Sequence, residues 1–191
     1  MRAVVVYESM FGSTRRVAEA VGEGLGDVGE VVVVPVEDAD AALDGGADLL
    51  VVGGPTHVHG LSRPRTRASA VAMADKPGSN LALDEHARGR GLREWLPAAP
   101  PAAGLGAAFD TRIAFPLSGH ASKAIGRQLR RRGYAMAEPP ESFLVGDENV
   151  LQPGEEERAR AWGERLGHDV ADRAGSEGRS GRRRSPRRAR P

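Results

Sequence analysis

The chain has 191 residues, with 27 basic and 26 acidic side chains and no cysteine. Without cysteine it has no disulfide, iron–sulfur cluster, thiolate-bound zinc or cysteine nucleophile, so any redox chemistry requires a bound cofactor. The charge is uneven: residues 174–191 carry seven arginines and one glutamate, which leaves 20 basic and 25 acidic side chains in residues 1–173. We expect one folded domain over 1–173 and a disordered Arg-rich tail over 174–191, which has too few apolar residues to offset the entropy of ordering.

Apolar strands alternate with amphipathic helices along the first half of the chain. Residues 2–7 form an apolar, β-branched run that is typical of a strand buried on both faces of a parallel sheet. From Ser13 the apolar residues recur at helical spacing, and Gly26 and Gly29 end this predicted helix. The alternation continues with a strand at 31–34, a short helix near 38–44 and a strand at 48–53.

The second half continues the pattern less regularly. We predict helices near 67–75 and ending at 91–96, a strand at 105–110 and a helix over 118–132. Apolar residues at 134–136 and 142–145 flank Pro139 and Pro140, which predicts an interrupted fifth strand. A last helix begins near Glu155 and buries Ala159, Trp162, Leu166 and Val170. Strand–helix–strand order predicts right-handed parallel crossovers with helices on both faces of the sheet.

The turn after the first strand, residues 7–14, is rich in hydroxyl groups and leads directly into a helix. The free backbone N–H groups of that helix start, together with the hydroxyls of Ser9, Ser13 and Thr14, suit a phosphate group. The Gly-x-Gly-x-x-Gly pattern of dinucleotide-binding proteins is missing after this strand, and the sequence holds no Gly-x-x-x-x-Gly-Lys-Ser/Thr pattern.

At this loop the sequence resembles the flavodoxin family, whose first loop reads approximately Thr/Ser-x-Thr-Gly-x-Thr. Ser9, Gly12 and Thr14 match, while Phe11 replaces the usual hydroxyl residue. The resemblance implies an α/β fold with a doubly wound, five-stranded parallel sheet of order 2-1-3-4-5, and FMN bound at the carboxyl ends of the strands. The FMN-binding residues it implies in this loop are Ser9, Met10, Phe11, Gly12, Ser13 and Thr14.

The segments after the third and fourth strands extend the resemblance, which spans roughly residues 2–170. The second loop looks like the flavodoxin segment that covers the flavin ring, and it implies contacts from Pro55, Thr56, His57, Val58, His59 and Gly60. A backbone carbonyl of this loop turns towards reduced flavin in family members, and Gly60 is best suited to such a flip. The third loop, at the pyrimidine edge, implies contacts from Asp110, Thr111, Ser118, Gly119 and His120.

The chain departs from many flavodoxins in the residues available to stack on the flavin. The second and third loops contain neither Trp nor Tyr, so we expect His57 and His59 to lie against the ring, with Phe115 the aromatic residue nearest the third loop. Trp95 and Trp162 are expected to be packing residues. A metal site at the two histidines lacks a third ligand, so no metal is expected.

The resemblance implies a redox protein that transfers electrons through noncovalently bound FMN, with no side chain required as an acid or base. Two alternatives stay open: an NAD(P)H-dependent, quinone-type FMN oxidoreductase, and a flavin-free binding or regulatory module, which Phe11 favours. The expected partner is a redox protein or a small-molecule acceptor. Arg63, Arg65 and Arg67 could meet an acidic partner, a nicotinamide-nucleotide phosphate or only solvent.

Location and other partners follow from what the sequence lacks. It has no apolar run of about 18 residues and no signal-peptide pattern, so we expect a cytoplasmic protein without membrane contact. The basic tail lacks accompanying aromatic residues, so nucleic-acid binding is not expected of it.

Overall fold

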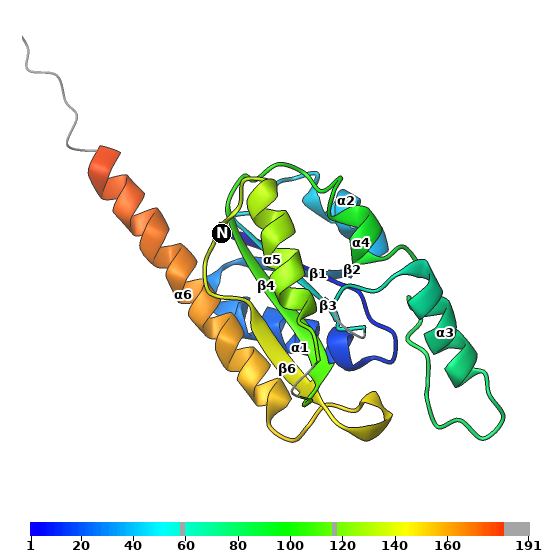
Figure 1. Ribbon diagram of the computed structural model, residues 1–191. Coiled ribbons are helices and arrows are strands. Elements are labelled where there is room, and N and C mark those ends of the chain that lie inside the picture. Colours follow the sequence, from blue (N-terminus) through cyan, green and yellow to red (C-terminus); the bar gives the residue numbers. More distant parts are fainter. Residues whose placement is uncertain (58–59, 116–117, 182–191) are drawn as a thin grey trace, which may run out of the picture.

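A parallel sheet forms the centre of the molecule (Figure 1) in the computed structural model, which describes residues 1–57, 60–115 and 118–181. The strand order is β2-β1-β3-β4-β5, with β6 also paired to β4, and every pair is parallel. The strands are β1 (Arg2–Tyr7), β2 (Glu30–Pro35), β3 (Leu49–Pro55), β4 (Leu105–Ile113), β5 (Ala135–Met136) and β6 (Glu141–Val145). The predicted order 2-1-3-4-5 is confirmed.

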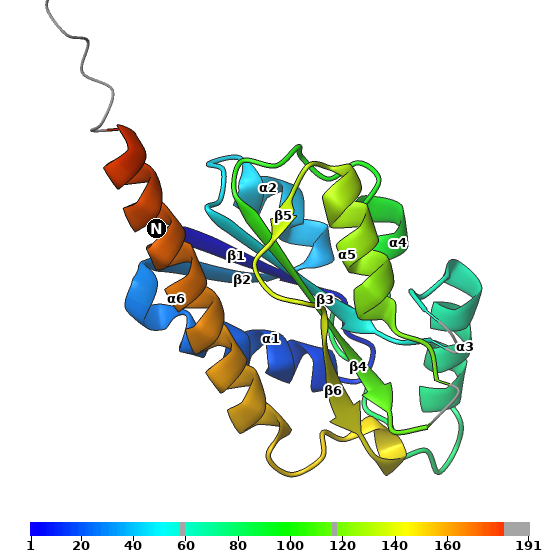
Figure 2. The same cartoon turned by 60° about the vertical axis from the view of Figure 1, so that its left-hand side comes forward.

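Helices cover both faces of the sheet (Figures 1 and 2). They are α1 (Ser13–Gly24), α2 (Ala39–Leu43), α3 (Pro64–Ala74), α4 (Leu92–Trp95), α5 (Ala121–Arg131) and α6 (Glu155–Gly181), with single turns η1 (Gly26–Val28), η2 (Val36–Asp38) and η3 (Asp147–Asn149). Alternate residues of β1 point to opposite faces. Val5 packs in the core under α1 and α6 with Trp162, and Val4 packs in the core under α4 and α5 with Trp95.

The fifth position in the sheet is filled by two short strands. β5 pairs with the start of β4, through Leu105 and Ala135, and β6 pairs with its end, through Ile113 and Val145. Pro139 and Pro140 lie between the two strands and cannot donate ladder hydrogen bonds. The predicted interruption is therefore confirmed, and it leaves β6 beside the carboxyl end of β4.

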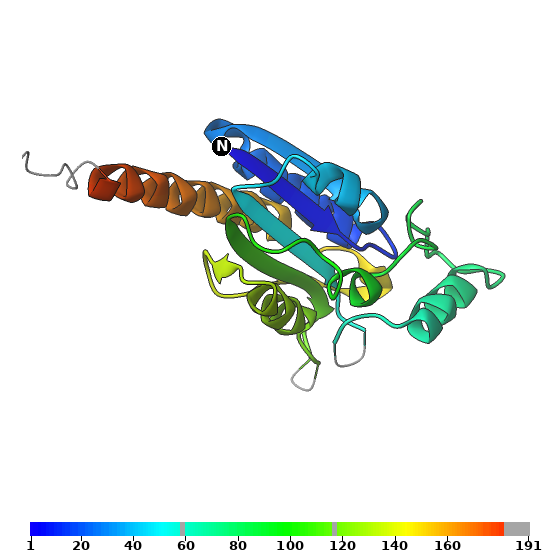
Figure 3. The same ribbon diagram turned by 90° about the horizontal axis from the view of Figure 1, so that it is seen from above.

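Two segments extend from the compact body. α6 is helical to Gly181, beyond the predicted domain boundary at residue 173, and it runs past the sheet (Figures 1 and 3). Residues 182–191 of the predicted tail lie outside the described residues, so the boundary stays a prediction. α3 stands apart, near the carboxyl ends of the strands (Figure 3). Among the described residues, the helices are all too short or too polar to cross a membrane.

Candidate functional site

The loop between β1 and α1 ends in a helix start that is open to an anion. Gly12 precedes α1 with φ 89° and ψ −25°, a left-handed conformation that suits glycine. Among the residues that the structure describes, no side chain caps this helix start, and its first turn carries no acidic residue. The N–H groups of Ser13 and Thr14 precede the first intrahelical hydrogen bonds, so they have no acceptor within α1. The positive end of the α1 dipole adds to their attraction for an anion.

The hydroxyl groups of the first loop have different roles. Ser9 is 2% exposed, and its Oγ accepts the Gly12 N–H at 3.1 Å, which leaves its own proton free to be donated. Ser13 donates its hydroxyl proton to the carbonyl of Asn149. The Thr14 and Thr111 hydroxyls are 2.8 Å apart and form a hydrogen bond that joins α1 to β4. Ser13 and Thr14 therefore tie the loop to neighbouring segments.

Met10 and Phe11 pack against α3 and the segment that follows it. Met10 is 3% exposed and forms a small apolar cluster with Ala70 and Ala87, against which Phe11 also packs. The Met10 carbonyl accepts the Asp84 N–H at 2.9 Å. Phe11 thus packs against the apolar cluster. Comparison with the flavodoxin pattern indicated only that a hydroxyl group is missing at this position.

The second loop begins with two residues that connect β3 to its neighbours. Thr56 donates its N–H to the Thr111 carbonyl at 2.8 Å, and its Oγ1 accepts the Ala121 N–H at the start of α5 at 2.9 Å. His57 and Gly60 form a backbone pair, with N–H to carbonyl distances of 2.8 and 3.1 Å. In this arrangement the Gly60 carbonyl is already engaged by the His57 N–H. Val58 and His59 lie outside the described residues.

Burial lowers the pKa of His57 below its ordinary value of 6.5, and the charge of Arg67 lowers it further. The imidazole is therefore neutral at pH 7, which suits a side chain that faces a flat, largely apolar ligand.

Most of the predicted site residues of the third loop make hydrogen bonds within the protein, and one of them lines the cavity. Asp110 is fully buried, and its Oδ2 accepts the Ser122 N–H in the first turn of α5 at 2.8 Å. Ser118 accepts a hydrogen bond from Arg112 at 2.8 Å, and His120 lies 3.3 Å from the Ser142 hydroxyl. These side chains and Gly119 do not line the cavity described next, whereas Thr111 does.

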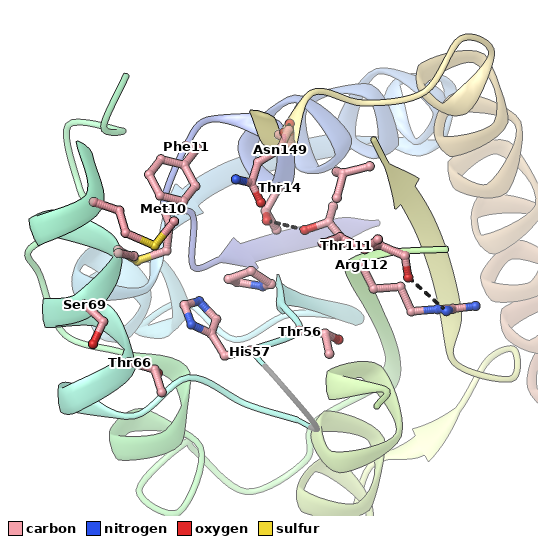
Figure 4. A pocket seen from close by; sticks show the side chains of 16 residues that line it. Met10, Phe11, Thr14, Thr56, His57, Thr66, Ser69, Thr111, Arg112 and Asn149 are labelled. Carbon is pink, nitrogen blue, oxygen red and sulfur yellow. Dashed lines mark hydrogen bonds between the residues drawn. The ribbon is translucent and has the colours of Figure 1, made fainter. Parts of the chain in front are cut away.

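A cavity of about 410 Å³ lies beside the start of α1 (Figure 4). Its size falls in the range of small-molecule and cofactor sites. The predicted site residues that line it are Met10, Phe11, Ser13, Thr14, Pro55, Thr56, His57 and Thr111. Ser9, Gly12 and Gly60 are not among its lining residues, and Ser9 and Gly12 are joined to each other by a hydrogen bond within the first loop.

Half of the cavity wall comes from residues that the sequence analysis did not assign to the site. They are Thr66, Ser69, Ala70, Met73, Arg112, Ile113, Val145 and Asn149. The α3 residues share one face of that helix, since they are three or four positions apart. A helix was predicted there, but nothing in its sequence showed what it packs against. Arg112 follows Thr111 directly, so its place in the third loop was a usable signal.

The sequence and the fold of this protein resemble those of known proteins. Residues 5–84 match the family model of flavodoxins. A flavodoxin from the domain Archaea is 22% identical with a TM-score of 0.62, and the alignment covers 90% of this chain and 99% of that one. Oxidised flavodoxin 1 from Bacillus cereus is 15% identical, with a TM-score of 0.57 and coverage of 87% and 97%. A flavodoxin, WrbA-like protein from Agrobacterium tumefaciens is 22% identical, with a TM-score of 0.56 and coverage of 90% and 98%. A search of curated protein sequences finds no match.

Proposed function

This chain is flavodoxin-like in sequence over residues 5–84 and in the fold of its described part, and on that premise we propose that it binds FMN in the cavity and transfers electrons through it. The observation that carries the proposal is the uncapped start of α1 beside that cavity. A phosphate there would meet converging N–H groups and the positive end of a helix dipole.

The phosphate would be held mainly by the backbone. The N–H groups of Ser13 and Thr14 are the donors, and the Ser9 hydroxyl adds a third because its proton is free. The Ser13 hydroxyl would continue to donate its hydrogen bond to the Asn149 carbonyl, and this contact orients the helix start. Phe11 contributes no donor, so the backbone has the larger share of phosphate recognition.

The ring would lie between the second loop, α3 and the end of β4. His57, Met73 and Ile113 supply apolar or neutral surface on these three walls. Such walls exclude water and fix the orientation of a flat ring, while bound FMN supplies the exchange of electrons.

The electron donor and acceptor would approach through the mouth of the cavity. Met73 and Ile113 line the cavity and are 50% and 58% exposed, which is unusual for large apolar side chains. A redox partner protein or a small-molecule acceptor would contact this apolar rim. Rapid reduction of the FMN-loaded protein by NADPH alone would favour an oxidoreductase, whereas reduction only through a reductase would favour an electron carrier.

FMN titration tests the proposal. Adding the apoprotein to FMN should quench the flavin fluorescence, and the double variant Ser9→Ala/Thr14→Ala should bind FMN about 10- to 100-fold more weakly. Ser9→Ala removes one hydrogen bond to the charged phosphate, worth roughly 1.5–3 kcal/mol, and Thr14→Ala removes the bond to Thr111 that holds the start of α1 in place. Riboflavin, which has no phosphate, is the matched control. Its affinity should be nearly the same for the variant and the wild type.

Two results would contradict this assignment. If the wild type leaves FMN fluorescence unchanged at every protein concentration, the chain is a flavin-free module. If the variant loses affinity for FMN and riboflavin equally, the phosphate does not sit at α1.

A further inference from the structure

The outer side of α5 carries a row of positive charges and no negative charge. We call its members the α5 cations; they are Lys123, Arg127, Arg130 and Arg131, and all of them are exposed. The helix itself holds no Asp or Glu. Because the four residues lie three, four or eight positions apart, they share one side of the helix, which Figure 1 shows on the outside of the molecule. The row extends over about 12 Å, since each helical residue adds about 1.5 Å.

The α5 cations have no acidic partner in the part of the chain that the structure describes. Their side chains form neither an ion pair nor a hydrogen bond with any described residue. By contrast, Arg67 pairs with Glu94 and Arg90 pairs with Asp40, each at 3.0 Å. The strands packed beneath α5 are β3, β4 and β5, and the single acidic residue in them, Asp110, is fully buried. The positive charge of the row is therefore not neutralised by its described neighbours.

The stability of α5 explains only part of this row. Arg130 and Arg131 lie in the last turn, where the negative end of the helix dipole attracts cations. Lys123 lies in the first turn, where the same dipole repels a cation. Lys123 and Arg127, and likewise Arg127 and Arg131, are like charges four residues apart, and such pairs destabilise a helix. The row as a whole therefore does not serve to stabilise α5.

An uncharged, apolar segment borders the C-terminal end of the row. The Ala102 N–H donates to the Arg132 carbonyl at 3.0 Å, which holds the segment 97–103 beside the end of α5. This segment consists of alanine and proline alone, and its exposed residues are Pro97, Ala98, Pro101 and Ala103. Arginines beside apolar side chains are typical of a protein–protein interface, whereas interfaces with nucleic acids are more polar.

We propose that α5 docks a protein with an acidic surface, whose carboxylates pair with the α5 cations while its apolar side chains cover the segment 97–103. Guanidinium groups form paired hydrogen bonds with carboxylates, so such a contact has a defined geometry as well as a favourable charge. The Arg-rich tail of this chain cannot occupy the row, because its charge has the same sign. The α5 cations do not line the cavity, so the inference holds whether or not FMN binds there.

Cross-linking to an acidic polymer tests the proposal. Poly-L-glutamate with activated carboxylates forms amide bonds with lysine amines and none with arginine. The sequence has two lysines, Lys123 in the row and Lys76, and both are exposed. The Arg-rich tail contains no lysine, so its own attraction for the polymer leaves no cross-link. Mass spectrometry of the full chain should therefore find more polymer on Lys123 than on Lys76.

A matched pair of variants separates the row from general charge. Arg127→Ala/Arg131→Ala should reduce the cross-linking of Lys123 about fivefold, as expected when two surface ion pairs are lost. Arg63→Ala/Arg65→Ala removes the same charge from exposed positions at the start of α3 and should leave the cross-linking of Lys123 unchanged. Thermal melting should show the α5 variant to be at least as stable as the wild type, because two repulsive pairs are removed. Both variants should bind FMN as the wild type does.

Several results would overturn the proposal. One is equal cross-linking of the two lysines in the wild type, and another is wild-type cross-linking of Lys123 in Arg127→Ala/Arg131→Ala. Gel-shift titration with double-stranded DNA should give equal binding for that variant and the wild type; weaker binding by the variant would make the row a nucleic-acid site. If the wild type elutes from size-exclusion chromatography as a dimer and the variant as a monomer, a second copy of the chain covers the row instead.

Discussion

Glu8 is a buried carboxylate next to the proposed phosphate loop. It follows β1 directly, is 5% exposed, and accepts the Leu92 N–H at the start of α4 at 2.8 Å. Burial raises the pKa of Glu8 above its ordinary value of 4.5, and this effect exceeds the opposite effects of Ser62, the Leu92 N–H and the charge of Arg67. Glu8 thus connects the end of β1 to α4, and its burial lowers the free energy of unfolding at pH values where the carboxyl group is charged.

Glu8→Gln should make the protein more stable than the wild type at neutral pH. A carboxyl whose pKa is raised in the folded state binds protons more tightly there than in the unfolded chain. The free energy of unfolding of the wild type therefore falls as the pH rises from about 4.5 through the raised pKa of Glu8. Gln removes this loss, which is about 1.4 kcal/mol for each unit by which the pKa is raised.

Urea unfolding between pH 4 and pH 8 measures the effect of Glu8→Gln. The two stability curves should diverge as the pH rises, while Glu157→Gln, at an exposed position, should follow the wild type. Parallel curves for Glu8→Gln and the wild type would show that the Glu8 carboxyl titrates normally.

At the scale of elements, α1 and α6 approach each other through two glycines. A Cβ atom on Gly24 would lie 2.1 Å from the Arg160 carbonyl oxygen, and one on Gly163 would lie 2.3 Å from the Val21 carbonyl oxygen. Both contacts are with backbone atoms, which cannot move aside as side chains do. The two helices therefore pack with their backbones in contact, and this contact fixes α1, whose first turn faces the cavity.

Gly24→Ala and Gly163→Ala should each destabilise the protein by about 1–3 kcal/mol, as overpacking does. The sign is opposite to the usual gain of up to about 1 kcal/mol when alanine replaces a helical glycine. Chemical denaturation measures both variants. Gly26→Ala is the matched control, because a Cβ atom at Gly26 meets nothing within 4 Å. Equal stability of Gly24→Ala and Gly26→Ala would contradict the close approach of the helices.

The strands were predictable because each buried strand is a short apolar run between turn residues, as at 2–7 and 48–53. Prolines 139 and 140 likewise showed the interruption before β6. The partners of the first loop were not predictable. Ser13 bonds Asn149 from 136 positions away, and only the folded chain brings the two together. α3 is rich in alanine and has no pronounced apolar stripe, so its sequence did not show that it forms a wall of the cavity.

At the scale of the whole molecule, binding of FMN should increase the free energy of unfolding of the protein. The cavity is built from the first loop, the second loop, α3, β4 and the β6–α6 connection, which come together only in the folded chain. A ligand that binds only the folded state adds about 2.7 kcal/mol at 100 times its dissociation constant.

This gain should raise the melting temperature by about 5–10 °C for a chain of this size, as measured by differential scanning calorimetry. At the same FMN concentration, Ser9→Ala/Thr14→Ala should show a smaller rise because it is less saturated. An identical rise in both proteins would mean that FMN binds away from the first loop.

Two side chains of the protein accept hydrogen bonds from the first N–H groups of α5. The Thr56 hydroxyl and the Asp110 carboxylate take the N–H groups of Ala121 and Ser122, so this helix offers no free N–H at either position, although Thr56 itself lines the cavity. Of these two helix starts at the carboxyl edge, α1 is open and α5 is closed. On the proposed binding of FMN, we therefore expect the single phosphate group to bind at the start of α1 and none to bind at the start of α5.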